Sequence, residues 1–264
     1  MDQRIPKAIR PALKHYLSLL NEQLPDLIKA FYIEGSIALG GFNEHFSDVD
    51  FMAILDRHPS STDIKKLRNI HKIIEQNYPR WRMSGSYLPS DNFKPYKMDV
   101  KPNIYFHDGL LKLDGHFELN SVEGWILKNH GIMLLGDEPQ DLPFIVDWDL
   151  LIVKMRENLN SYWVNWTKRP FKIIIMLFDS GIQWTVLGVL RQFYSFRENS
   201  ITTKIKAGEY GLAKLPFRWH RLIKEAIEIR EGNKTSAYRF RIVRTIEAVR
   251  FVKFIIQTCN ADVG

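Results

Sequence analysis

The chain has 264 residues, of which 45% are hydrophobic and 12% aromatic, and its net charge is +7. A globular chain of this length can bury an apolar core without disulfides. The single cysteine, Cys259, excludes a disulfide framework and a cysteine-based zinc site. No stretch reaches the roughly 18 apolar residues of a membrane span, and the charged N-terminal segment lacks the core of a signal peptide. We therefore expect a cytoplasmic protein with no membrane partner.

The basic charge makes polyanions candidate partners, among them nucleoside triphosphates, nucleic acid and acidic membranes. The lysines and arginines are scattered along the chain and form no block. This scatter favours a solvated basic surface over a groove for nucleic acid.

The first half of the chain predicts alternating helices and strands. Apolar residues at helical spacing predict a first helix over residues 5–22. The further ranges predicted are strands at 27–33, 49–55, 81–88 and 132–135, helices at 60–74 and 121–130, and loops with short strands at 89–116.

The pattern changes after Pro139 and Pro143, beyond which long helical repeats dominate. The predicted helices cover residues 148–166, 171–197, 216–230 and 235–258. Gly208, Gly211 and Pro216 predict a loop between helices. We therefore expect an α/β domain with a mixed sheet over 1–145, followed by an all-α helical bundle over 146–264.

Residues 34–50 read EGSIALGGFNEHFSDVD and lie between two predicted strands. Gly35 lets the backbone turn tightly and approach a ligand. Ser36 is predicted at the start of a helix, where free N–H groups and the positive end of the helix dipole suit phosphate oxygens. The serine hydroxyl would add one more hydrogen bond to the same phosphate.

Asp48 and Asp50 have one residue between them, so in an extended segment both side chains point to the same face. Two neighbouring carboxylates need a counter-cation. Mg²⁺ suits them because it combines one or two carboxylates with substrate phosphates. The alternative is an edge strand with two solvated aspartates. The Gly-Ser pair and Gly40-Gly41 at this spacing favour the metal site.

The pattern of Gly-Ser, a loop and then S-D-x-D resembles that of the polymerase-beta-like nucleotidyltransferases. The form GSIALGGFNEHFSDVD is similar to the bacterial aminoglycoside adenylyltransferases of the streptomycin/spectinomycin type. The resemblance implies a nucleotidyltransferase domain joined to a helical domain, with ATP and Mg²⁺ in the cleft between them. By position, Ser36 and Ser47 would contact phosphates, while Asp48 and Asp50 would hold magnesium.

The helical half carries a second match to this family. Arg191 and Lys204 lie thirteen positions apart in VLRQFYSFRENSITTK, as do an arginine and a lysine that reach the triphosphate in the family. A triphosphate needs cations beyond magnesium, which agrees with this role. The alternative for Arg191 is an ordinary residue on a helix surface.

The family's general base is a glutamate, and its position falls at Ser84, which is a poor base at neutral pH. Three explanations are open. In the first, the register is shifted and another carboxylate serves as the base, with Asp99 preferred over Asp108 and Glu118. In the second, the enzyme relies on positioning and metal ions. In the third, the protein binds nucleotide and transfers it poorly or not at all.

The acceptor pocket also departs from the family. The aromatic that stacks on the drug corresponds at best to Phe117, and the drug-pairing aspartate falls near Gly181, two residues from Asp179. His107 and His116, in FHDGLLKLDGHFE, either line the cleft or belong to a solvated turn. The acidic residues available to a polycationic drug are Asp108, Asp114, Glu118 and Asp179.

The expected function is therefore Mg²⁺-dependent transfer of a nucleoside monophosphate to a hydroxyl of a small molecule, with release of pyrophosphate. AMP from ATP is the favoured donor, and an aminoglycoside antibiotic is the favoured acceptor, which implies a role in antibiotic resistance. The alternatives are a lincosamide, protein or RNA acceptor, or a nucleotide-binding protein that has lost its catalytic base. A monomer and a dimer are both compatible with the sequence.

Overall fold

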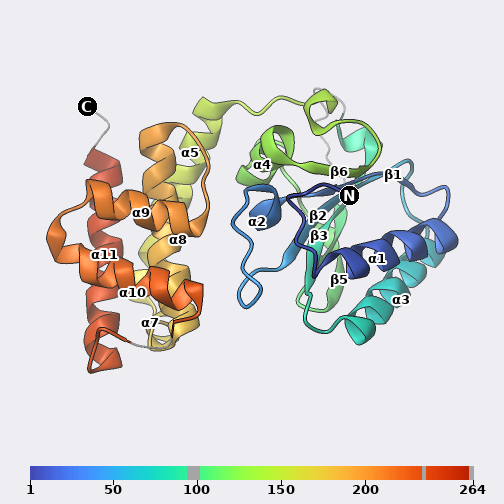
Figure 1. Cartoon of the computed structure of the whole chain (residues 1–264). Coiled ribbons are helices and arrows are strands. Elements are labelled where there is room, and N and C mark those ends of the chain that lie inside the picture. The colour runs from blue at the N-terminus through green and yellow to red at the C-terminus, as the bar shows by residue number, and fades with distance from the viewer. Residues whose placement is uncertain (94–101, 234–235, 262–264) are drawn as a thin grey trace. The chain divides into compact units, whose positions relative to one another are not determined.

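The computed structural model describes residues 1–93, 102–233 and 236–261. The chain divides into two compact units (Figure 1). The first comprises Met1–Phe42 and Ser47–Val146, and the second comprises Asn43–Phe46 and Asp147–Gly264. A mixed sheet lies in the first unit and helices form the second, so the predicted fold class is confirmed.

Among the described residues, the sheet has six strands in the order β5-β4-β3-β2-β1-β6. Strands β2 and β3 are parallel, and the other neighbours are antiparallel. The strands are β1 (Ile28–Ile33), β2 (Val49–Leu55), β3 (Met83–Pro89), β4 (Asn103–His107), β5 (Leu110–Gly115) and β6 (Ile132–Leu135). The helices of this unit are α1 (Arg10–Gln23), α2 (Gly35–Ala38), α3 (Ser61–Asn77) and α4 (Val122–His130).

Helix α3 provides the crossover that a parallel β2–β3 pair requires. Its start is fixed by a capping box, in which the Asp63 N–H donates to Ser60 Oγ and the Ser60 N–H donates to Asp63 Oδ2. The Arg57 guanidinium and these contacts with Ser60 lower the pKa of the Asp63 carboxyl. The predicted start at Ser60 is thus confirmed.

Helices α1 and α3 lie side by side on one face of the sheet, and α4 lies on the other (Figure 1). On the α1/α3 face, His71 Nε2 lies 2.7 Å from Tyr87 Oη and 3.2 Å from Tyr16 Oη, and the two tyrosine hydroxyls are hydrogen-bonded to each other. The His71 ring also stacks on Phe106. Burial lowers the pKa of His71 to about 3, so the ring is neutral inside this core.

The second unit is built of helices. They are α5 (Trp148–Asn158), α6 (Val164–Lys168), α7 (Pro170–Ile175), α8 (Asp179–Glu198), α9 (Lys204–Lys214), α10 (His220–Glu231) and α11 (Arg241–Ala261), with a π-helical turn at Leu159–Trp163. Helices α9, α10 and α11 all contact α8. The segment 43–46 joins this unit, because Phe46 packs against its core and Asn43 Nδ2 donates to the Arg230 carbonyl oxygen at 2.6 Å.

Two predictions for the helical half are wrong. The single helix predicted over 171–197 is two helices, α7 and α8, because Phe178 is extended. The loop predicted at Gly208 and Gly211 lies inside α9, where both glycines allow close helix packing. A Cβ on Gly208 would lie 2.8 Å from Ile227 Cδ1, and one on Gly211 would lie 2.8 Å from Leu190 Cδ2.

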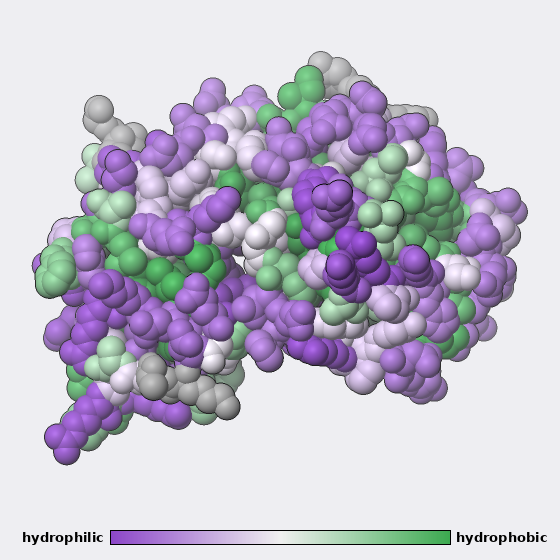
Figure 2. Space-filling view, in the orientation of Figure 1, coloured by the Kyte–Doolittle hydropathy of each residue, from purple (hydrophilic) through white to green (hydrophobic). Residues whose placement is uncertain are grey.

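On the face shown in Figure 2, polar residues cover most of the surface of each unit, and hydrophobic residues occur in separate patches. Within the described ranges, no helix combines the length and the apolar character that crossing a bilayer would require.

Candidate active site

The site begins where β1 ends, at Glu34 and Gly35. Gly35 has a φ of +60°, a left-handed conformation that favours glycine. The Asp50 carboxylate, on β2, fills the space beside it, because a Cβ on Gly35 would lie 2.1 Å from Asp50 Oδ2. The backbone is therefore brought directly against the carboxylate, and only a residue without a side chain allows this approach.

Asp48 directly precedes β2, with Ser47 before it, and Val49 between the two aspartates is fully buried. Arg82 Nη2 lies 3.0 Å from Asp48 Oδ1. Within the described ranges, no group of three or more histidine, cysteine, aspartate or glutamate side chains is arranged to hold a metal ion. Two carboxylates on one short segment still fit Mg²⁺, because its remaining ligands are commonly water and phosphate oxygens.

Ser36 lies in the first turn of α2, a helix of a single turn. Its Oγ is buried and makes no hydrogen bond. A buried hydroxyl without a partner is costly, so a ligand oxygen at this position would be stabilising. This observation fits the phosphate contact that the resemblance implies for Ser36.

Glu34 is buried, and its Oε2 makes no hydrogen bond. Burial raises the pKa of the Glu34 carboxyl well above its ordinary value, and the negative charges of Asp50 and Glu123 raise it further. A cavity of about 490 Å³ opens at these side chains. Its lining includes the carboxylates of Glu34, Asp50, Asp114 and Glu123, together with His107, His116 and Phe117.

Ser84 lies directly opposite Asp50 in the parallel β2–β3 pair. The position that the sequence analysis gave to the family's general base therefore falls on β3, beside the second aspartate, at a residue that is not a carboxylate. Ser84 Oγ instead lies 3.0 Å from His107 Nδ1. Asp99, the preferred substitute base, lies outside the described residues. Asp108 follows His107 in the turn between β4 and β5.

The predicted cations Arg191 and Lys204 belong to the second unit, on α8 and at the first position of α9. Arg230, on α10, is a third cation near Arg191. Burial lowers the pKa of Arg230, and the positive charge of Arg191 lowers it further. The Arg230 side chain lies over the Phe46 ring, and its Nη1 is 3.3 Å from Gln183 Oε1.

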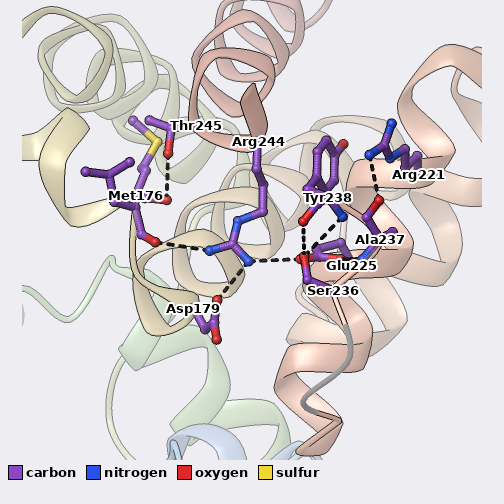
Figure 3. Close-up of polar contacts among 10 residues, drawn as sticks. Met176, Asp179, Arg221, Glu225, Ser236, Ala237, Tyr238, Arg244 and Thr245 are labelled. Carbon is purple, nitrogen blue, oxygen red and sulfur yellow. Dashed lines mark hydrogen bonds and ion pairs between the residues drawn. The ribbon is translucent and has the colours of Figure 1, made fainter. Parts of the chain in front are cut away.

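Neither Gly181 nor Asp179, the positions compared with the family's drug-pairing aspartate, offers a free carboxylate. A Cβ on Gly181 would lie 2.0 Å from the Ile175 carbonyl oxygen, so no side chain fits there. Asp179 Oδ1 lies 2.8 Å from Arg244 Nη1, which also donates to Glu225 Oε1 at 2.9 Å (Figure 3). Asp179 is thus already paired with a cation.

Sequence reasoning missed Glu34 and Arg82 in the first unit and, in the second unit, Arg230 near Arg191. Glu34 could have been found in the sequence as a charged residue directly after the apolar run 27–33, because a charged residue next to a buried strand often has a function. Arg82 and Arg230 carried no such signal, because their significance depends on contacts with Asp48 and Phe46.

Two protein families match the chain. The nucleotidyltransferase domain matches residues 13–117, and the aminoglycoside adenylyltransferase C-terminal domain matches residues 177–255. The structure of the spectinomycin adenyltransferase AAD(9) from Enterococcus faecialis, with ATP and spectinomycin, has a TM-score of 0.63 to this chain at 13% identity. The match covers 92% of this chain and 99% of that one, and it shows a shared fold. No match was found among curated protein sequences.

Each half of the chain thus contains a match to one of the two domains that the motif at residues 34–50 and the cations Arg191 and Lys204 indicate. The chain is a nucleotidyltransferase that resembles the aminoglycoside adenylyltransferases.

Proposed function

We propose that this protein transfers AMP from ATP to a hydroxyl of a small molecule and releases pyrophosphate, with Mg²⁺ as cofactor. The observation that carries the proposal is the approach of the Asp50 carboxylate to the Gly35 backbone, with Asp48 two residues before it. This arrangement puts one of two potential metal ligands directly against the backbone of the Gly35-Ser36 turn.

Asp48 and Asp50 would hold the metal, and Ser36 Oγ would donate its hydrogen bond to a phosphate oxygen. Bound magnesium would neutralise phosphate charge and polarise the α-phosphate. Arg191 and Lys204 would pair with the triphosphate, since guanidinium and ammonium groups form strong charge-assisted hydrogen bonds with phosphate. Ser47 would contribute a further phosphate contact beside Asp48.

The acceptor is proposed to be an aminoglycoside-type antibiotic. The whole chain carries +7, yet the cavity beside Asp50 is also lined by the carboxylates of Asp114 and Glu123. An acidic cavity in a basic protein attracts a polycationic ligand in preference to a neutral one. The structural relative was determined with spectinomycin, which makes that drug the first acceptor to test.

One observation favours a second candidate, a protein that binds Mg²⁺ and ATP without transferring AMP. Ser84, and not a carboxylate, lies opposite Asp50. A serine alone does not accept a proton at neutral pH.

The test is pyrophosphate release from ATP and Mg²⁺ with streptomycin, spectinomycin, kanamycin or lincomycin as acceptor. Asp48→Asn is expected to lower the drug-dependent rate at least about 100-fold. Asp56→Asn, at the other end of β2 and exposed, is the matched control. Full activity in Asp48→Asn contradicts the mechanism. Silence with every drug, with ATP binding intact by calorimetry, supports the binding-only candidate.

A further inference from the structure

Three side chains from neighbouring strands form a row beside the cavity. Asp50 on β2 is paired with Ser84 on β3. In the antiparallel β3–β4 pair, Gly85 is opposite Phe106, so Ser84 and His107 are the next residues outward on the two strands. All three side chains line the same cavity.

The contact between the last two members of the row has hydrogen-bond geometry. Ser84 Oγ lies 3.0 Å from His107 Nδ1. The other ring nitrogen of His107, Nε2, lies 3.3 Å from Asp108 Oδ2. Both contacts fit one tautomer, in which Nε2 carries the proton toward Asp108 and Nδ1 accepts from the Ser84 hydroxyl.

The turn after β4 explains why Asp108 lies beside His107. Asp108 and Gly109 have φ values of 49° and 75°, and they connect β4 to β5. Positive φ at both central residues is the conformation of a two-residue hairpin turn, which favours Asp-Gly. The Asp108 conformation is therefore fixed by the hairpin.

We propose that His107, acting through Ser84 Oγ, is the general base that prepares the acceptor hydroxyl for attack. This inference rests on the proposed function. The Ser84 hydroxyl takes the proton of the acceptor hydroxyl as its own proton passes to His107 Nδ1. The acceptor oxygen bonds to the α-phosphorus, the bond from that phosphorus to the bridging oxygen breaks, and its electron pair leaves with pyrophosphate. His107 then releases the proton to water.

The charges around His107 suit this role. Asp108 lies against Nε2, and the cavity that His107 lines also holds Asp50, Asp114, Glu34, Glu123 and His116. From α3, the Glu75 carboxylate reaches the hairpin turn, where a Cβ on Gly109 would lie 3.3 Å from Glu75 Oε1. Except for Glu34, whose raised pKa favours the uncharged form, these carboxylates place negative charge around the imidazole that takes up the proton.

The first test reads the hydrogen-bond chain directly and needs no acceptor. Nitrogen-15 NMR of the histidine rings distinguishes the two neutral tautomers. We expect His107 in the wild type to carry its proton on Nε2 alone, and in Ser84→Ala to show a mixture of tautomers. Identical His107 signals in the two proteins would overturn the proposal.

The second test measures kcat and KM for pyrophosphate release with spectinomycin and with streptomycin. His107→Gln is expected to lower kcat about 100-fold with little change in the KM for ATP. His58→Gln is the matched control, since His58 also lies beside a carboxylate, with Nε2 3.2 Å from Asp91 Oδ1, and is similarly exposed. The control should retain the wild-type kcat.

A carboxylate at position 84 provides a rescue that a structural role of His107 would not predict. The double variant Ser84→Glu/His107→Gln is expected to regain most of the lost kcat. In the double variant, kcat should begin to fall at a lower pH than in the wild type, because a glutamate titrates at lower pH than a histidine. An unchanged kcat in His107→Gln, or a lowered kcat that Ser84→Glu does not rescue, would overturn the base assignment and leave the proposed function standing.

The remaining outcomes separate this inference from the proposed function. If the wild type releases no pyrophosphate with any acceptor, the proposed function fails and the inference fails with it. If the wild type is active and mass spectrometry finds AMP covalently attached to Ser84, the serine is a nucleophile and the relay is wrong.

Discussion

Arg82 Nη2 lies 3.0 Å from Asp48 Oδ1, so a proposed magnesium ligand already faces a fixed positive charge. The arginine side chain is 62% exposed and the aspartate side chain 28% exposed, so solvent screens the pair. Mg²⁺ and the Arg82 guanidinium would compete for the same carboxylate.

Arg82→Gln is expected to lower the Mg²⁺ concentration that gives half-maximal pyrophosphate release. Because an exposed ion pair contributes at most about 1 kcal/mol, the change should be no more than about fivefold. Arg80→Gln, an exposed arginine two residues away, should leave the titration unchanged. A higher Mg²⁺ requirement in Arg82→Gln would show that the arginine supports the site.

Gly35→Ala should abolish activity, because the new Cβ would meet Asp50 Oδ2 at 2.1 Å and the residue would retain a φ of +60°. The left-handed conformation alone costs about 1–2 kcal/mol in a residue with a side chain. Gly40→Ala is the matched control, since Gly40 has a φ of +70° and nothing within 4 Å of its Cβ position. Both variants should lose stability in urea, Gly35→Ala more because of its contact with Asp50, and only Gly35→Ala should lose Mg²⁺-dependent ATP binding. Equal ATP binding in both would argue against a site at Asp50.

Glu34→Gln should stabilise the protein increasingly as the pH rises. The pKa of the Glu34 carboxyl is raised in the folded state, so the wild type keeps its full stability below the ordinary pKa of a glutamate and loses part of it as the carboxyl ionises. Glutamine does not ionise. Urea unfolding at pH 5 and pH 8 should therefore favour the variant by about 1–3 kcal/mol more at the higher pH. The exposed Glu138→Gln should show no such dependence.

His71 should make the protein sensitive to acid. Its pKa is lowered to about 3 by burial, so the unfolded chain binds a proton at a higher pH than the folded one. Stability from this group is complete above the ordinary histidine pKa of about 6.5 and falls by up to about 1.4 kcal/mol per pH unit below it. His71→Gln removes that slope. The difference in unfolding free energy between the wild type and His71→Gln should therefore be smaller at pH 4.5 than at pH 7. The exposed His116→Gln should show the same pH dependence as the wild type.

Much of the fold was predictable because its signals are local. The apolar run at 49–55 is strand β2, and the Ser60–Asp63 capping box begins helix α3. The sequence misled where a distant contact decides the local structure. Gly208 and Gly211 are helix breakers by propensity, yet they lie inside α9, where Ile227 and Leu190 leave no room for a side chain.

The site shows the same division. Gly35, Ser36, Asp48 and Asp50 are recognisable because they lie within sixteen residues of one another in the chain. The contact of Ser84 with His107 spans 23 residues and depends on the pairing of β3 with β4. His107 and its neighbours left two readings open in the sequence, and the strand register favours the one in which they line a cavity.

The short segment 43–46, between Ser36 and Asp48, belongs to the second unit although both its ends continue in the first. The two units are therefore not separable by a single cut after Val146. A fragment ending there would carry Phe46 and Asn43 without the core and the Arg230 carbonyl that they contact. Any chimera that exchanges the helical half for that of a relative would have to exchange these four residues as well.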